Sequence, residues 1–118
     1  MKYKTQELVG GLLDAAVSKA EGYPFRVTVS ESLRTTLAMA LGPNDDAWYP
    51  SQRWDHAGPL IERERITLEW IGGASGPVEW LSWCPGLERD ERGPTPLIAM
   101  MRAYVRSKFG AEVDLSDV

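Results

Sequence analysis

Hydrophobic residues recur at helical spacing in two segments, one near each end of the chain. In residues 5–21 the apolar positions form one stripe, made of Leu8, Val9, Leu12, Leu13, Ala16, Val17 and Ala20. Thr5 is placed to cap this helix, and Gly22 followed by Pro24 is placed to end it. The second stripe contains Leu97, Ile98, Met101, Tyr104, Val105 and Phe109. Its helix is expected to begin after Thr95, with Pro96 in the first position, and to end at Gly110.

Two adjacent glycines, Gly10 and Gly11, interrupt the first stripe. Each glycine inside a helix costs about 1 kcal/mol relative to alanine. We therefore expect the backbone of a packed neighbour to approach the helix closely at this point.

Strict alternation marks a β-hairpin in the second half of the chain. Ile66, Leu68 and Trp70 alternate with more polar residues, as do the residues of 78–83, and a glycine-rich turn lies between the two runs. Residues 25–29 are rich in aromatic and β-branched residues and predict a further short strand. The predicted fold class is α+β, with two main helices packed on a small, mostly antiparallel sheet that contains the central hairpin.

Three shorter segments are harder to interpret. Residues 33–41 fit either a helix or an alternating strand, and their Ala, Leu and Met content favours the helix. Residues 43–58 have the composition of a long loop. Residues 62–65, Glu-Arg-Glu-Arg, alternate in charge at strand spacing and predict the solvated start of a strand.

Composition and charge place limits on the function. The 118 residues suit a single domain, 1–118, and the acidic tail at 111–118 is expected to fray. A formal net charge of -4 disfavours nucleic acid as the main partner. The lone cysteine, Cys84, excludes an internal disulfide and is expected to be buried and non-catalytic. No apolar run is long enough for a membrane span, so cytoplasmic residence is the default expectation.

No catalytic or metal-binding motif is complete in the sequence. His56 is the single histidine, and Asp55 with Glu62 would be its acid–base partners in an alternative interpretation as a small enzyme. A metal site would lack nitrogen and sulfur ligands beyond His56 and Cys84, so we predict no metal, no cofactor and no catalytic residue.

A second alternative is nucleic-acid binding through Arg102, Arg106 and Lys108, which are expected to be exposed on the last helix. The acidic residues that follow them would offset their charge.

Aromatic residues are concentrated in residues 43–62, which makes this segment the candidate binding surface. The candidate binding residues are Trp48, Tyr49, Arg53, Trp54, Asp55 and His56. So much aromatic area is either buried against the core or presented to a partner. We expect Trp54 to be structural and Trp48, beside two aspartates, to be exposed.

Three stretches of the chain resemble a known phage family. They are KTQELVG at 4–10 with LDAAVSKAEG at 13–22, YPSQRW at 49–54 with GPLIER at 58–63, and GPTPLIAMMRAYV at 93–105. In this order they resemble a family of phage and prophage proteins similar to the phage nin-region protein X. The family pattern often has Gly-Gly-Pro where this chain has Ala57-Gly58-Pro59, and residues 25–48 match least well.

The resemblance implies a phage or prophage accessory protein in a bacterial cytoplasm, and it brings no catalytic residues. Together with the acidic charge and the aromatic segment, it favours a non-enzymatic protein that binds a host or phage protein. Neither the identity of this partner nor the oligomeric state follows from the sequence.

Overall fold

The computed structural model describes residues 1–30, 32–44, 46–72, 79–87 and 89–115. Its helices are α1 (Gly10–Glu21), α2 (Trp54–Glu64) and α3 (Pro96–Phe109), with a short 3-10 turn, η1 (Thr5–Glu7). Its strands are β1 (Lys2–Lys4), β2 (Phe25–Ser30), β3 (Thr35–Ala40), β4 (Thr67–Trp70), β5 (Trp80–Trp83), β6 (Glu91–Gly93) and β7 (Glu112–Asp114). The α+β class is confirmed, but within the described residues the strands form three small antiparallel sheets, β1–β7, β2–β3 and β4–β5–β6.

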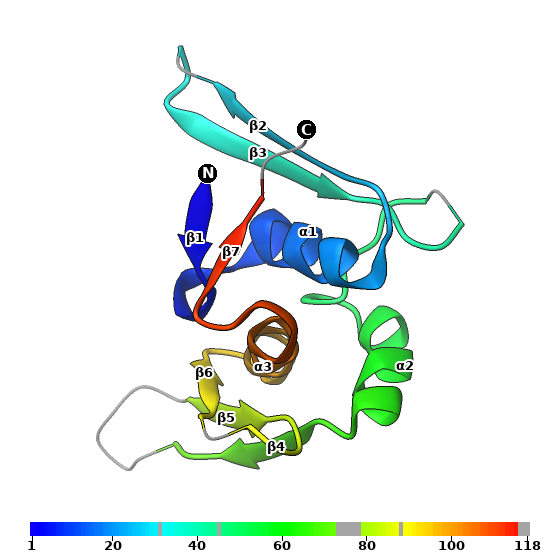
Figure 1. The fold of residues 1–118 in the computed structure, drawn as a ribbon, viewed down its shortest axis with the longest axis vertical. Coiled ribbons are helices and arrows are strands. Elements are labelled where there is room, and N and C mark those ends of the chain that lie inside the picture. Colours follow the sequence, from blue (N-terminus) through cyan, green and yellow to red (C-terminus); the bar gives the residue numbers. More distant parts are fainter. Residues whose placement is uncertain (31, 45, 73–78, 88, 116–118) are drawn as a thin grey trace.

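Helix α3 lies at the centre of the molecule, between α1 and the β4–β5–β6 sheet, with α2 alongside (Figure 1). Its predicted ends are confirmed, because the Thr95 hydroxyl accepts a hydrogen bond from the Ile98 amide and Pro96 is the first residue. Gly110 ends it with a φ of 84°. The buried positions extend well beyond the predicted stripe, since Ala99, Met100 and Ala103 are buried too. This central position explains why the helix has few solvent-facing residues.

The start of α1 differs from the prediction that Thr5 caps it. Thr5 is buried in η1, where its hydroxyl donates to the Gly110 carbonyl at 2.7 Å and its amide donates to the Ala111 carbonyl at 2.9 Å. These bonds tie the first residues to the end of α3, so α1 begins only at Gly10. The predicted C-terminal end is confirmed, with Gly22 left-handed at a φ of 79°.

Close packing at Gly11 is confirmed. A Cβ atom at Gly11 would lie 2.6 Å from the Ala38 carbonyl oxygen, so a side chain there has no room. Ala38 belongs to β3, and the prediction of a helix over 33–41 is therefore wrong. The segment pairs with β2 in a register that runs from Phe25 opposite Ala40 to Ser30 opposite Thr35. Hydrogen-bonded pairing with β2 and packing on α1 together override the helical propensity of Ala, Leu and Met.

Residues 54–64 form α2, so the predicted loop over 43–58 ends early and the predicted strand start at 62–65 is wrong. The helix contains Gly58 and Pro59, which argue against a helix when the sequence is considered alone. Ala57 and Leu60, three residues apart, are buried against the core and place one face of α2 on the molecule.

The hairpin of β4 and β5 is confirmed, with Trp70 directly opposite Trp80, while residues 73–77 of its predicted turn lie outside the described residues. Cys84, just after β5, is buried as expected. The prediction that the tail frays is wrong for residues 112–115, because β7 pairs with β1 and both Val113 and Leu115 are buried.

Two helical glycines give a matched test of this packing. Gly11→Ala should destabilise the fold by about 1–3 kcal/mol, because its Cβ meets the Ala38 carbonyl. Gly58→Ala, whose Cβ would have no neighbour within 4 Å, should stabilise it by up to about 1 kcal/mol. Urea denaturation of both variants measures the difference, and two changes of the same sign would show that α1 and β3 do not meet as described.

Candidate functional site

The segment that leads into α2 is fixed to α1 by a buried carboxylate. Asp14, only 1% exposed, accepts a hydrogen bond from the Ser51 backbone amide at 2.8 Å through Oδ1. Its Oδ2 is buried without a hydrogen-bond partner among the described residues. Burial raises the pKa of Asp14 to about 6, although the hydrogen bond from Ser51 acts in the opposite direction. The backbone at residue 51 is therefore held at a defined point on α1.

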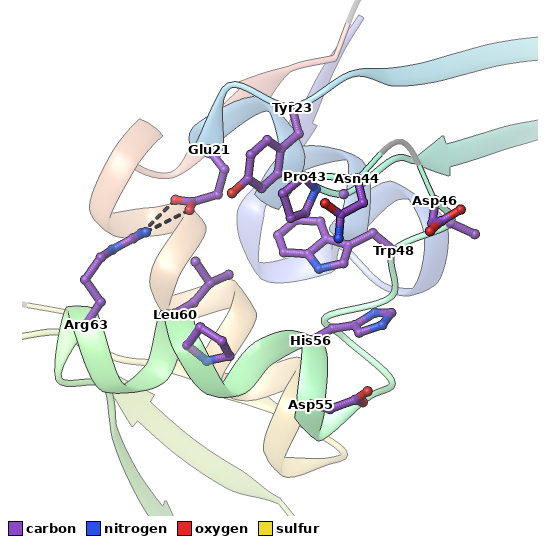
Figure 2. Close-up of a pocket in the computed structure, with 13 residues that line it drawn as sticks. Glu21, Tyr23, Pro43, Asn44, Asp46, Trp48, Asp55, His56, Leu60 and Arg63 are labelled. Carbon is purple, nitrogen blue, oxygen red and sulfur yellow. Dashed lines mark hydrogen bonds and ion pairs between the residues drawn. The ribbon is translucent and has the colours of Figure 1, made fainter.

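A second carboxylate of α1 holds the far end of α2. Glu21 accepts two hydrogen bonds from the Arg63 guanidinium, at 2.8 and 2.7 Å (Figure 2). It accepts another from the Tyr104 hydroxyl of α3. The pKa of Glu21 is lowered, chiefly by the hydrogen bonds from Arg63. Glu64 extends this network by pairing with Arg63 and with Lys108. The ends of all three α-helices are thereby joined.

Trp48 is buried, at 8% exposure, and the expectation that it is exposed is not met. Its ring packs edge-on against Tyr23, with centroids 5.3 Å apart and an interplanar angle of 81°. Gly42 allows this position, because a Cβ there would lie 2.9 Å from the indole ring. Trp48 thus anchors the loop before α2 to the core.

Tyr49 and His56 form a stacked pair at the surface. Their rings are 6.4 Å apart at 11°, and the Tyr49 backbone amide donates to His56 Nδ1 at 2.9 Å. Because Nδ1 accepts this bond, the proton of the neutral imidazole lies on Nε2. The His56 side chain therefore joins the start of α2 to the backbone of Tyr49, and one of its two ring nitrogens is occupied by this bond.

Trp54 is 57% exposed, so the expectation that it is structural is wrong. Next to it, Arg53 and Asp55 form an exposed two-bond ion pair at 3.0 and 2.8 Å. Trp54 also borders a groove of about 400 Å³ that runs to the start of α3 and is lined by Ser51, Gln52, Thr95, Pro96, Leu97 and Ile98. An exposed indole, an apolar groove and a charged pair therefore share one surface.

A second recess of about 340 Å³ lies between α2, the end of α1 and the loop before α2. In Figure 2 the Glu21–Arg63 pair lies at one end of this recess, with His56 and Asp55 at the other. Tyr23, just after α1, and Trp48, in the loop before α2, also line it. The Glu21 and Arg63 side chains already bond to each other, which leaves a mixed polar and aromatic recess the size of one or two side chains.

The acid–base constellation of the enzyme alternative is only partly brought together. His56 and Asp55 line the same recess, whereas Glu62 is exposed and does not line it. The Asp55 carboxylate is engaged by Arg53, which lowers its pKa. Among the residues that the structure describes, no three His, Cys, Asp or Glu side chains gather in a way that would hold a metal ion.

The basic residues of the nucleic-acid alternative do not form a free surface. Arg102 is half-buried and donates to two backbone carbonyls at 2.8 and 2.7 Å. Arg106 pairs with buried Glu91 at 2.8 Å, and Lys108 pairs with Glu64 at 2.8 Å. The expectation that both arginines point into solvent is wrong, because the β6 segment and η1 pack over α3 at this face.

Sequence reasoning missed the two carboxylates that position this surface. Asp14 interrupts the apolar stripe between Leu13 and Ala15, and a charged residue inside such a stripe is a signal of a buried polar contact. Glu21 lies seven residues later, on the same face of α1. Their partners, Ser51 and Arg63, carry no comparable signal.

Fold and surface define a small α+β protein with exposed aromatic residues at the start of α2. Over residues 4–108 the chain matches the family model described as bacteriophage P22 NinX. The chain therefore belongs to this phage family, the nin-region protein X family, whose function is unknown. No curated protein matches the chain. Among the described residues, no helix is long and apolar enough to cross a membrane.

The raised pKa of Asp14 predicts a pH-dependent difference between the wild type and Asp14→Asn. A carboxyl whose pKa rises on folding stabilises the fold at low pH, and this contribution is lost as the pH rises through about 6. The free energy of unfolding of Asp14→Asn should therefore rise by about 2 kcal/mol relative to that of the wild type between pH 4 and pH 7.5.

Chemical denaturation at a series of pH values measures this difference. Asp55→Asn removes a surface carboxylate whose pKa is lowered, and it should show no such gain. A constant difference between Asp14→Asn and the wild type across the range would contradict a buried, ionisable Asp14.

Proposed function

We propose that this chain is a non-enzymatic phage or prophage accessory protein that acts in the bacterial cytoplasm by binding a host or phage protein. The binding surface is built on Tyr49, Arg53, Trp54, Asp55 and the flanking groove at the start of α3. The observation that carries this proposal is the exposure of Trp54 beside that groove. Tryptophan, tyrosine and arginine are the residues most enriched at the energetic centres of protein interfaces.

Rigidity of the surface supports a binding role. The Ser51 amide is held by Asp14, Tyr49 is stacked on His56, and Arg53 is held by Asp55. A surface that is already ordered loses little conformational entropy when a partner binds. The residues around Trp54 therefore do not need to become ordered when a partner binds.

The arrangement also has the layout of an interface. The groove and the Trp54 ring supply apolar area, whereas the Arg53–Asp55 pair supplies a polar rim. The recess next to His56 lies within the same region and offers room for a partner side chain. By contrast, the alternatives that need a catalytic His56 with Glu62, or a basic face on α3, draw no support from these contacts.

The chain offers a matched pair of exposed tryptophans for the test. Trp54 and Trp70 are 57% and 60% exposed, and Trp70 lies on β4 and does not line the groove beside Trp54. Trp54→Ala should weaken partner binding by about 2 kcal/mol or more, which is more than a tenfold rise in Kd, and should leave Tm nearly unchanged. Trp70→Ala should bind as the wild type does.

Affinity capture from uninfected and phage-infected host lysates, followed by binding measurements with the purified partner, compares the three proteins. Equal binding by wild type and Trp54→Ala would show that the interface lies elsewhere. Capture that depends on Trp70 and not on Trp54 would have the same meaning.

A further inference from the structure

The β2–β3 hairpin extends along α1 and past it, with its connection at one end of the molecule (Figure 1). Phe25 and Val27 on its inner face are partly buried in the core, but Val29 on the same face is 50% exposed. Within the described residues this sheet has two strands. A two-stranded sheet needs further strands or packing against a helix to be stable in water, and the end of this hairpin that carries Val29 lacks the cover that α1 gives to Phe25 and Val27.

β2 forms the outer edge of the hairpin. β3 makes most of the contact with α1, where the Ala38 carbonyl meets Gly11. β2 therefore presents a row of backbone groups that no described strand pairs. Natural edge strands are usually protected by lysine, proline or a bulge. The sequence of β2, Phe-Arg-Val-Thr-Val-Ser, has no lysine or proline, and its register with β3 is unbroken.

We infer that β2 pairs antiparallel with β2 of a second copy of this chain, about a twofold axis at Thr28, to give a continuous four-stranded sheet. In this register Thr28 faces Thr28 of the second copy, Val27 faces Val29 and Arg26 faces Ser30. These are favourable pairs of β-branched or polar residues across strands. Five of the six residues of β2 are then paired with a residue of β2 in the second copy.

The single charge of β2 selects this register. An axis at Arg26 would place the two Arg26 side chains directly opposite each other. An axis at Val27 would place them diagonally, within about 7–8 Å on the same face. An axis at Thr28 separates them by four residues along the strand. An axis at Val29 would pair only three residues of β2 with β2 of the second copy.

The same pairing accounts for the exposure of Val29. An antiparallel pair related by a twofold axis keeps equivalent faces on the same side of the sheet. The inner-face Val29 therefore lies beside Val27 of the second copy, which packs toward its own α1. The part of the hairpin that extends past α1 in one copy therefore lies near α1 of the second copy. Each copy in this way helps to bury apolar residues of the other.

Sedimentation velocity at increasing protein concentration tests this inference. Wild type should shift from the monomer mass to twice that mass. Thr28→Lys and Thr28→Glu, both at an exposed position, should remain monomeric because each places like charges opposite each other across the axis. A one-to-one mixture of the two variants should recover the dimer, because Lys then faces Glu.

Leu37→Lys serves as the matched control. Leu37 is 59% exposed on β3, on the outer face of the same hairpin, and does not lie on the β2 edge. This variant should dimerise like the wild type, and circular dichroism with Tm verifies that every variant folds. A monomeric wild type at all concentrations would overturn the inference. So would dissociation by Leu37→Lys alone, or a mixture of Thr28→Lys and Thr28→Glu that stays monomeric.

Discussion

Two carboxylates on one face of α1 determine where α2 lies, and the candidate surface depends on that placement. Asp14 holds the Ser51 amide just before α2, and Glu21, two turns later, holds Arg63 near its end. Neither Gly58 nor Pro59 favours a helix at this position, so α2 depends strongly on such tertiary contacts. Buried Leu60 supplies the apolar contact between the two polar attachments.

The two attachments respond to pH in opposite ways. Burial raises the pKa of Asp14, so its contribution to stability falls as the pH rises through about 6. Arg63 lowers the pKa of Glu21, so its contribution falls when acid protonates it. Retaining a buried carboxylate at Asp14 has a cost in stability that an apolar residue would not have. In return, the Asp14 carboxylate fixes the backbone at Ser51, and this backbone orients Tyr49 and Trp54 on either side of it.

The sequence predicted those features that depend on local rules. The Thr95 cap, Pro96 and the end at Gly110 follow from the chemistry of helix ends, and the β4–β5 hairpin follows from its alternation. The strand β3 and the helix α2 were not predicted, because the packing of β3 on α1 and the contacts of α2 with α1 and α3 override local propensity. The exposure of Trp48 and Trp54 was predicted the wrong way round for the same reason. Trp48 is placed by its contacts with Tyr23 and Gly42, and Trp54 by its position at the start of α2, and composition encodes neither.

Hydrogen exchange followed by mass spectrometry tests most directly whether α1 positions α2. In Asp14→Ala and in Glu21→Ala, peptides that cover residues 49–63 should lose protection, whereas peptides that cover β2 and β3 should keep it, because local opening is confined to the released element. Unchanged protection of residues 49–63 in both variants would contradict the account. Equal loss across the whole chain would also contradict it, because the two carboxylates would then support the fold in general and not the placement of α2.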